Sequence, residues 1–372
     1  MKFQASTQIL RDAIGEGIIP SATYAIGQGD RVLASGCEGY ASLFPEKQAV
    51  TENTLYDMAS LSKLLSTTMV ALCMIERGEI LLSDTLSHFF TEDELADAPE
   101  GRREVSIFRL MTHTSGISPH LPLWNLIDPN IVGTKDFDSA VASTILRSAP
   151  VCKRGEQVHY SCMGYILLQK ILERVSGKPL DVLANEFVFS PLGMTRTGYL
   201  PFGDNENHPT ANAAATELSG IHGYYIRGHV HDENAHFLGG VSGNAGVFSD
   251  LSDMTRFARM LALRGGIPDG GRLISERMFD LAVRDYTPTM NESRGLGFQL
   301  RPPLPRPSAA GDLFAYGSYG HTGFTGTSLY VDSRSGMWVL LMTNVVHLGR
   351  DKSKFFRVRR QFHNSVMGEM QQ

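Results

Sequence analysis

Strand-like segments lie at both ends of this 372-residue chain, and helix-like segments fill its middle. Near the N-terminus, two β-forming runs at residues 21–26 and 31–34 are joined by Gln-Gly-Asp, which predicts a hairpin. Strand patterns return at residues 297–300, 327–331 and 337–343. Because each strand must bury an apolar face, the economical packing places the hairpin beside the C-terminal strands in one antiparallel sheet.

Helical spacing of apolar residues completes an α+β architecture. Terminal helices are expected over residues 3–16 and 353–370, where they would cover the sheet. Five more helices are expected at residues 61–77, 139–147, 164–176, 179–189 and 251–264. Ser252 or Asp253 is the expected N-cap of the last of these.

We therefore expect residues 1–372 to form a single unit with two lobes. The sheet lobe would take residues from about 1–60 and 285–372, and the helix-rich lobe would take residues from about 61–284. Functional sites are favoured at interfaces of this kind, so the site is expected between the lobes.

Composition excludes several classes of protein. Hydrophobic residues make up 42% of the chain, and 34 basic against 39 acidic residues give a net charge of −5. No basic face for nucleic acid is indicated, and no run reaches the roughly 18 apolar residues of a membrane span. The N-terminus lacks the apolar core of a signal peptide, which favours a cytoplasmic protein. The four cysteines form no CxxC pair, so we expect reduced thiols and no metal site.

The first motif is Ser60-Leu-Ser-Lys63, which follows an extended run at residues 54–58 and opens a helix. Residues three apart share a helix face, so Ser60 and Lys63 point the same way. Backbone N–H groups at a helix start can stabilise an oxyanion, and an adjacent amine can take the serine proton. The alternative is an N-cap serine beside an ordinary surface lysine.

Two further motifs follow. Tyr160, in His-Tyr-Ser-Cys-Met-Gly-Tyr, leads into a helix, and a tyrosine beside a lysine ammonium can hold a lowered pKa and serve as a base. A core tyrosine is the alternative. In residues 320–326, His321 and Thr322 could bind or polarise a substrate that lies against a strand edge, whereas the alternative is a glycine-rich turn.

In order and context, these motifs resemble the serine β-lactamase and penicillin-binding-protein superfamily, nearest the class C β-lactamases, DD-peptidases and family VIII-type esterases. The resemblance runs from about residue 6 to about residue 347. It is supported by Leu-Met-Thr-His-Thr-Ser-Gly at 110–116, Ser-Pro-Leu-Gly-Met at 190–194 and the stretch 243–260. It implies a β-lactamase/DD-peptidase-like fold, an antiparallel sheet flanked by terminal helices plus a helical lobe.

The resemblance also implies roles for individual residues. Ser60 would be the nucleophile, Lys63 its partner, and Tyr160 the general base for acylation and the acid toward the leaving group. His321, Thr322 and Gly323 match the third motif, commonly Lys-Thr-Gly. The backbone N–H groups of Ser60 and Phe324 would form the oxyanion hole. Neither a metal nor an organic cofactor is implied.

Two departures from the family pattern bear on the substrate. Cys162 stands where class C β-lactamases have asparagine, and a thiol is a weak hydrogen-bonding group. His321 replaces a permanent lysine cation, and a histidine ordinarily titrates near pH ~6.5, so an acid activity limb is expected. Both changes argue against an efficient β-lactamase and favour an esterase or a peptidase that acts on small acyl or D-amino-acid compounds. Carboxylic esters are the preferred substrate class, with weak or no β-lactam turnover.

Alternatives remain open. Within enzymes they are a D-amino-acid peptidase or DD-carboxypeptidase and a β-lactamase. From another class, the alternative is a non-catalytic binder of penicillin or peptidoglycan fragments, against which the intact Ser60, Lys63 and Tyr160 argue. The partner would be a small ester, peptide or β-lactam, and nothing indicates an oligomeric state.

For the other polar and aromatic residues, structural roles are the preferred interpretation. The segment 227–236 could hold a metal through His229, His231, Asp232 and His236, but a loop near the cleft is preferred. His113 and Ser115 are expected in a structural turn. Ser62 lies off the Ser60–Lys63 face and could still approach the site, and the aromatic residues Trp124, Tyr224 and Tyr225 line a cleft or simply pack.

Overall fold

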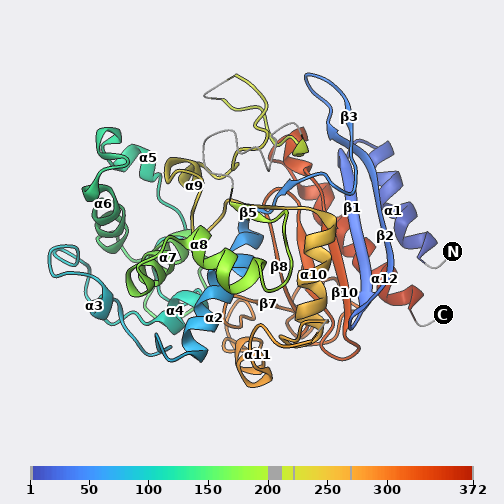
Figure 1. Ribbon diagram of the computed structural model, residues 1–372. Helices are drawn as coiled ribbons and strands as arrows, with labels where there is room; N and C mark the ends of the chain where they lie inside the picture. Colours follow the sequence, from blue (N-terminus) through green and yellow to red (C-terminus); the bar gives the residue numbers. More distant parts are fainter. Residues whose placement is uncertain (1–2, 200–211, 221–222, 269, 371–372) are drawn as a thin grey trace.

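A seven-stranded antiparallel sheet is the centre of the structure, a computed structural model that describes residues 3–199, 212–220, 223–268 and 270–370 (Figure 1). The N-terminal hairpin, β1 (Ser21–Gln28) and β2 (Arg31–Ser42), lies beside β10 (Met337–Met342), with Thr23 opposite both Cys37 and Met342. The order is β3-β2-β1-β10-β9-β8-β7. The remaining strands are β3 (Gln48–Ala49), β7 (Gln299–Leu300), β8 (Tyr319–Thr322) and β9 (Ser328–Val331). The predicted sheet from both chain ends is confirmed.

The two terminal helices cover one face of this sheet. α1 (Gln4–Gly15) and α12 (Ser353–Glu369) lie side by side at the right of Figure 1, where both chain ends also lie. They bury Leu10 and Phe362 against Val339 and Leu341 of β10. The expected terminal helices are therefore present and pack where they were predicted.

A helix from the middle of the chain covers the other face. α10 (Leu251–Ala262) contacts β1, β9 and β10. Its N-cap is Asp250, whose side chain accepts a hydrogen bond from the N–H of Asp253, so the expected caps Ser252 and Asp253 were wrong. Asp250 is the one residue between the end of β6 and the first residue of α10, so it takes the N-cap position.

The other described helices form the lobe at the left of Figure 1. The largest is α7 (Cys162–Ser176), of which nine residues are buried. The others are α2 (Met69–Glu76), α3 (Leu86–Phe89), α4 (Ile107–Met111), α5 (Leu123–Leu126), α6 (Lys135–Leu146), α8 (Leu180–Ala184), α9 (Glu233–Phe237) and α11 (Glu276–Ala282), with short 3-10 or π turns at η3 (Pro129–Ile131) and η4 (Asn185–Phe189). A further 3-10 turn, η6 (Val345–Leu348), follows β10 and packs with the terminal helices.

The segment expected as one helix at residues 61–77 has three parts. A 3-10 turn, η1 (Ala59–Leu61), leads into a π-helical turn, η2 (Lys63–Thr68), and then into α2. Residues Ala59–Glu76 are long and apolar enough to cross a membrane by length and composition, but 83% of this stretch is buried within the fold. It is the central helix of the main core, and π-helical turns are frequent at functional sites.

Four short strands, β3, β5 (Gly198–Tyr199), β6 (Val247–Ser249) and β8, were not predicted from the sequence, whereas β4 (Tyr56–Asp57) lies within the extended run expected at residues 54–58. β4, β5 and β6 form a small second sheet, and their two or three residues show no periodicity. β8 contains Gly320, and a glycine-rich turn was the alternative interpretation of these residues. A Cβ atom at position 320 would lie 2.0 Å from the carbonyl oxygen of Leu329, so the glycine marks close strand packing.

Candidate active site

Ser60 lies in the 3-10 turn that connects β4 to the buried central helix. The residue before it, Ala59, has φ 47°, a left-handed conformation that costs a non-glycine residue energy. The buried carboxylate of Asp57 accepts a hydrogen bond from the Ala59 N–H at 2.8 Å, and this contact supports the turn. The local strain therefore lies directly beside the candidate nucleophile.

Lys63 is fully buried and its ammonium group points at Ser60. The Nζ atom lies 3.1 Å from Ser60 Oγ, 3.4 Å from Cys162 Sγ and 2.8 Å from the carbonyl oxygen of Asn244. An ammonium group has three donors, and each has an acceptor here. The structure thus brings Ser60 and Lys63 together, and Lys63 is not a surface lysine. Asn244 is a member of this cluster that sequence reasoning missed, because a backbone acceptor leaves no residue signature.

Tyr160 packs among aromatic rings and cations next to this pair. Its ring centroid lies 4.9 Å from Lys63 Nζ, 5.2 Å from the guanidinium carbon of Arg294 and 4.5 Å from the ring of His113. Its hydroxyl is buried and forms no hydrogen bond of good geometry with any described residue. The hydroxyl is therefore available to a bound substrate or to a shifted Lys63 or Ser60.

The pKa values of this cluster differ from the sequence expectation. Burial raises the pKa of Tyr160, and the nearby Lys63 charge offsets only part of this effect, so the expected lowered pKa was wrong. Burial by itself lowers the pKa of Lys63, but attraction to Cys162 and Tyr160 outweighs burial and raises that pKa above its usual range. The resting cluster therefore holds an ammonium group and a neutral phenol.

Cys162 is the first residue of α7, and its thiol lies against the Lys63 ammonium. Burial raises the pKa of Cys162, so the group that replaces the family's carboxamide is a neutral thiol. A thiol binds an amide of a substrate more weakly than a carboxamide does.

His321, on β8, carries no positive charge in the neutral pH range. Its Nδ1 lies 2.7 Å from the carbonyl oxygen of Thr322, and because a carbonyl only accepts, Nδ1 carries the proton. The Nε2 atom is then an acceptor, and it is buried with no partner among the described residues. Burial lowers the pKa of His321 to about 3, so the titration expected near pH ~6.5 does not apply.

Gly323 and Phe324 attach the third motif to the nucleophile segment. A Cβ atom at position 323 would lie 2.3 Å from the carbonyl oxygen of Met58, which accounts for the glycine. Thr327 Oγ1 donates to the same carbonyl at 3.1 Å, and Thr325 Oγ1 donates to that of Asp57 at 2.7 Å. These contacts hold the third motif against the segment that precedes Ser60, and Phe324 and Ser60 line the same cleft.

A cleft of about 290 Å³ contains the predicted residues Ser60, Tyr160, His321, Thr322, Gly323 and Phe324. Its other lining residues are Glu292, Arg294, Gln299, Lys352, Phe356 and Arg359. Sequence reasoning missed the three cations, because single basic residues on a loop and on the last helix carry no motif. The predicted site residues and a cationic wall therefore share one cleft.

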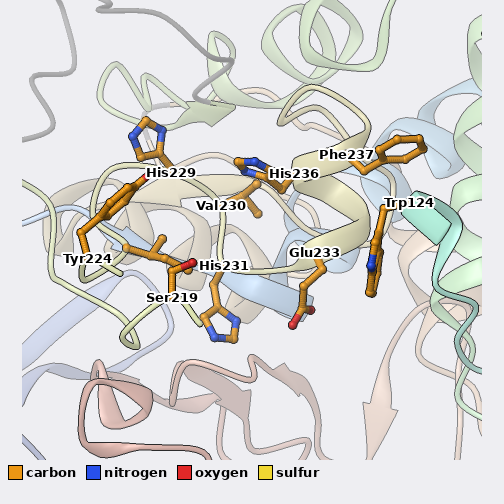
Figure 2. Close-up of a pocket in the computed structure, with 10 residues that line it drawn as sticks. Trp124, Ser219, Tyr224, His229, Val230, His231, Glu233, His236 and Phe237 are labelled. Carbon is orange, nitrogen blue, oxygen red and sulfur yellow. The ribbon is translucent and has the colours of Figure 1, made fainter. Parts of the chain in front are cut away.

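A second cavity, of about 270 Å³, lies beside the histidine-rich segment (Figure 2). Its walls are largely apolar and include Trp124, Ile226, Val230 and Phe237. The ring of His231 also lines it and stacks on that of Phe324 with centroids 5.7 Å apart. Phe324 lines the Ser60 cleft and His231 lines the apolar cavity, so the two cavities adjoin at this pair of rings.

The imidazoles of the histidine-rich segment do not converge. In Figure 2, His229, His231 and His236 lie at different sides of the cavity. Within the described ranges, no group of three or more His, Cys, Asp or Glu side chains could hold a metal ion. The backbone N–H of His231 donates to Asp57 at 2.7 Å, so the segment connects to the nucleophile turn, in line with the preferred loop near the cleft.

The remaining candidates have structural contacts. His113 Nδ1 accepts the N–H of Ser161, and Ser115 Oγ accepts the N–H of Ile117, as a turn requires. Ser62 is buried and accepts the N–H of Val247. Tyr225 stacks on Phe44 and meets His347 edge to face, whereas Trp124 and Tyr224 line the apolar cavity.

A serine at a strained helix start, a buried lysine and a tyrosine, set between an antiparallel sheet and a helical lobe, define a serine hydrolase of the β-lactamase and penicillin-binding-protein type. The chain belongs to the Beta-lactamase family, whose family model matches residues 7–362.

Known relatives of this chain differ in their named activities. It is 28% identical over 356 residues to a putative D-alanyl-D-alanine carboxypeptidase of Salmonella typhimurium, covering 88% of this chain and 79% of that protein. The fold is similar to EstCE1, a hydrolase with promiscuous acyltransferase activity, with TM-score 0.73, 21% identity and coverage of 98% and 97%. It is also similar to the octameric penicillin-binding protein homologue of Pyrococcus abyssi, with TM-score 0.69, 20% identity and coverage of 92% and 74%.

Proposed function

We propose that this protein hydrolyses carboxylic esters through an acyl-Ser60 intermediate, with weak or no β-lactam turnover. One observation carries the proposal. Ser60 Oγ lies 3.1 Å from the Nζ atom of a fully buried lysine, in a cleft that also contains Tyr160. The ammonium group of Lys63 holds the nucleophile in place and stabilises a phenolate on Tyr160, and an activated nucleophile of this kind is what covalent catalysis needs.

The Tyr160–Lys63 pair would move the proton of Ser60. In the resting pair, both the Lys63 ammonium group and the Tyr160 phenol are protonated. Loss of the phenol proton creates the base, a phenolate beside an ammonium group. Ser60 Oγ then attacks the acyl carbon while its proton passes to Tyr160. As the carbon–oxygen bond to the leaving group breaks, Tyr160 returns that proton to the leaving oxygen. Water attacks the acyl-enzyme in the same way and releases the acid and free Ser60.

Backbone N–H groups would stabilise the oxyanion. The contacts of Gly323, Thr325 and Thr327 hold the third motif against the segment that precedes Ser60. In this proposal the N–H groups of Ser60 and Phe324 bind the negative oxygen of the tetrahedral intermediate. Fixed donors of this kind reduce the barrier without reorganisation in the reaction.

Two features favour esters over β-lactams. The neutral thiol of Cys162 binds a substrate amide poorly, and His321 lacks the charge of the family's lysine. The apolar cavity behind Phe324 offers room for the hydrocarbon part of an acyl group (Figure 2). The similarity in fold to a hydrolase with acyltransferase activity agrees with this preference.

A D-amino-acid peptidase is the second candidate. The relatives named as carboxypeptidases and the cationic lining of the Ser60 cleft support it. A non-catalytic binder is less well supported, because burial of an ammonium group beside a serine is costly and brings no benefit to simple binding.

The experiment is intact-mass spectrometry after brief exposure to a p-nitrophenyl ester or to penicillin, with release of p-nitrophenol followed in parallel. The wild type and Ser60→Ala are compared with Ser190→Ala, an exposed serine outside both cavities. We expect ester turnover or an acyl adduct that only Ser60→Ala abolishes, and little penicillin adduct. Equal activity in Ser60→Ala would refute the acyl-Ser60 mechanism, and a dominant penicillin adduct would refute the ester preference.

A further inference from the structure

A further cavity, of about 300 Å³, lies in the helical lobe and shares no lining residue with the Ser60 cleft or the apolar cavity. We call it the Arg102 cavity. Its walls come from two loop segments, residues 99–105 and 150–154, and from Ser115. Three of its lining residues are cations, Arg102, Lys153 and Arg154, whereas one is a carboxylate, Glu100. The proposed hydrolysis of esters uses none of these residues.

Arg102 is the buried cation of this cavity, with 3% of its surface exposed. Its Nη1 and Nη2 atoms donate to the carbonyl oxygens of Ile145 and Ser148, at 3.4 and 2.9 Å, at the end of α6. A guanidinium group has five N–H donors, so these contacts leave three of them free. Burial lowers the pKa of Arg102 to about 10, and the group therefore keeps its charge at neutral pH.

No carboxylate neutralises this buried charge in the described part of the chain, where Arg102 forms no ion pair. The two carbonyl oxygens carry only partial charges. A buried charge without an opposite charge destabilises the protein, because the Coulomb attraction that would offset its desolvation is missing. An anion bound in the cavity would supply that attraction.

The other two cations of the cavity are exposed, and they are weakly neutralised. Lys153 forms no ion pair with a described residue, and the ion pair of Arg154 with Glu104 is long, at 3.8 Å. Arg154 Nη1 donates instead to the carbonyl oxygen of Gly101 at 3.1 Å, which holds this guanidinium group beside the backbone of Arg102. Three cations therefore converge on one cavity of a protein whose net charge is −5.

The wall that contains Ser115 is fixed and adds one more donor. A Cβ atom at Gly116 would lie 2.5 Å from the carbonyl oxygen of Cys152, so the Ser115 turn packs closely against the segment 150–154. Ser115 Oγ accepts the N–H of Ile117, and its hydroxyl hydrogen is left to donate. The cavity thus offers a hydroxyl group beside its cations.

The number of these donors favours a phosphate group over a carboxylate. A phosphate monoester carries about −1.5 to −2 charges near pH 7 and has three strong acceptor oxygens. Three cations and a hydroxyl group match that charge and those oxygens, whereas a single guanidinium group is enough for a carboxylate. The cavity is larger than a phosphate group, and Pro99, Val105 and Pro150 give it apolar surface, so an organic group fits beside the phosphate.

We propose that the Arg102 cavity binds the phosphate group of a small organic phosphomonoester. Arg102, Lys153 and Arg154 bind the phosphate oxygens, the Ser115 hydroxyl donates to one of them, and the apolar wall contacts the organic part. The exposed side chain of Glu100 turns toward water when the anion is bound. This site is independent of the proposed ester hydrolysis, because none of its residues lines the Ser60 cleft.

Isothermal titration calorimetry with phenyl phosphate tests this site in the whole protein. Two matched probes accompany it: inorganic phosphate lacks the organic part, and phenyl sulfate carries a single negative charge. We expect saturable binding of phenyl phosphate to the wild type. We expect each matched probe to bind at least about tenfold more weakly, because each loses contacts that phenyl phosphate makes.

Variants locate the ligand. Lys153→Gln/Arg154→Gln removes the two exposed cations and leaves the buried Arg102 in place, and Arg277→Gln/Arg284→Gln removes the same charge from exposed positions outside the cavity. We expect the first variant to bind phenyl phosphate about 10- to 100-fold more weakly and the second to bind it as the wild type does, because charge-assisted hydrogen bonds are lost only in the first. Arg102→Gln should abolish binding, and thermal unfolding shows whether that variant folds.

Three results would overturn the proposal. The first is the absence of saturable binding of phenyl phosphate to the wild type. The second is equal affinity in the wild type and in Lys153→Gln/Arg154→Gln, which would assign the ligand to another cationic surface such as the Ser60 cleft. The third is equal affinity for phenyl phosphate and a matched probe. With inorganic phosphate this result would mean an adventitious ion only, and with phenyl sulfate it would exclude recognition of a phosphate group.

Discussion

Two cavities of similar size and opposite character adjoin at the stacked rings of Phe324 and His231. The Ser60 cleft is lined by cations and by polar atoms that lack partners, whereas the cavity in Figure 2 is largely apolar. Both cavities are connected to the turn that carries Ser60 through Asp57. Thr325, near the Ser60 cleft, donates a hydrogen bond to the backbone carbonyl of Asp57, and His231, in the apolar cavity, donates its N–H to the Asp57 side chain. One short segment thus supports both a reactive surface and a surface for apolar binding.

The largest expected effect concerns the reactive cavity. Tyr160→Phe removes the proposed base and should reduce the rate of Ser60 acylation by about 10²–10⁴-fold. Stopped-flow measurement of p-nitrophenol release gives this rate. Tyr225→Phe is the matched control, because Tyr225 stacks on Phe44 outside the cleft. Acylation close to the wild-type rate in Tyr160→Phe would leave Lys63 as the base.

The second effect is on the pH dependence of the same cavity. Tyr160 acts as a base only when deprotonated, and burial raises its pKa, so kcat/KM should increase with pH, about tenfold per unit, into the alkaline range. The pKa of about 3 for His321 excludes an ascending limb near pH 6.5 from that residue.

A pH series on the wild type and His321→Lys tests this point. We expect the alkaline ascent in both proteins and no limb near pH 6.5 in the wild type. A wild-type limb between pH 6 and 7 that His321→Lys removes would show that His321 titrates in the ordinary range after all.

The smallest expected effect concerns the apolar cavity. Trp124→Ala should reduce kcat/KM for a p-nitrophenyl hexanoate by roughly five- to tenfold relative to the acetate, because less apolar surface is buried, at about 0.8 kcal/mol per CH₂. Leu126→Ala, at an exposed position on the same short helix, is the control. An equal loss of kcat/KM for both esters would show that this cavity does not bind the acyl chain.

The sequence predicted the sheet and the helices well because their periodic patterns are long. β1, α7 and α12 lie where apolar spacing placed them, whereas β2 continues to Ser42, eight residues beyond the expected run. It could not predict β8, because the glycine that permits close packing against Leu329 also resembles a turn.

The sequence predicted the residues of the candidate site that belong to recognisable motifs, but not those outside them. Ser60, Lys63 and Tyr160 lie together because local spacing and the family pattern both mark them. Their protonation states could not be predicted, since burial determines the direction of the pKa shifts of Tyr160 and His321. Arg294 and Arg359 were missed because they reach the cleft only through the packing of segments that are distant in the sequence.

The order of strands in the sheet has a consequence for the synthesis of the protein. β1 lies between β2 and β10, so the N-terminal hairpin has no neighbour on one side until residue 342 has been made. Thr325 and Thr327, which donate hydrogen bonds to the segment before Ser60, are also synthesised late. A ribosome-bound chain that ends before β10 should therefore be unable to form an acyl-enzyme, and the nascent protein stays inert until β10 has been made.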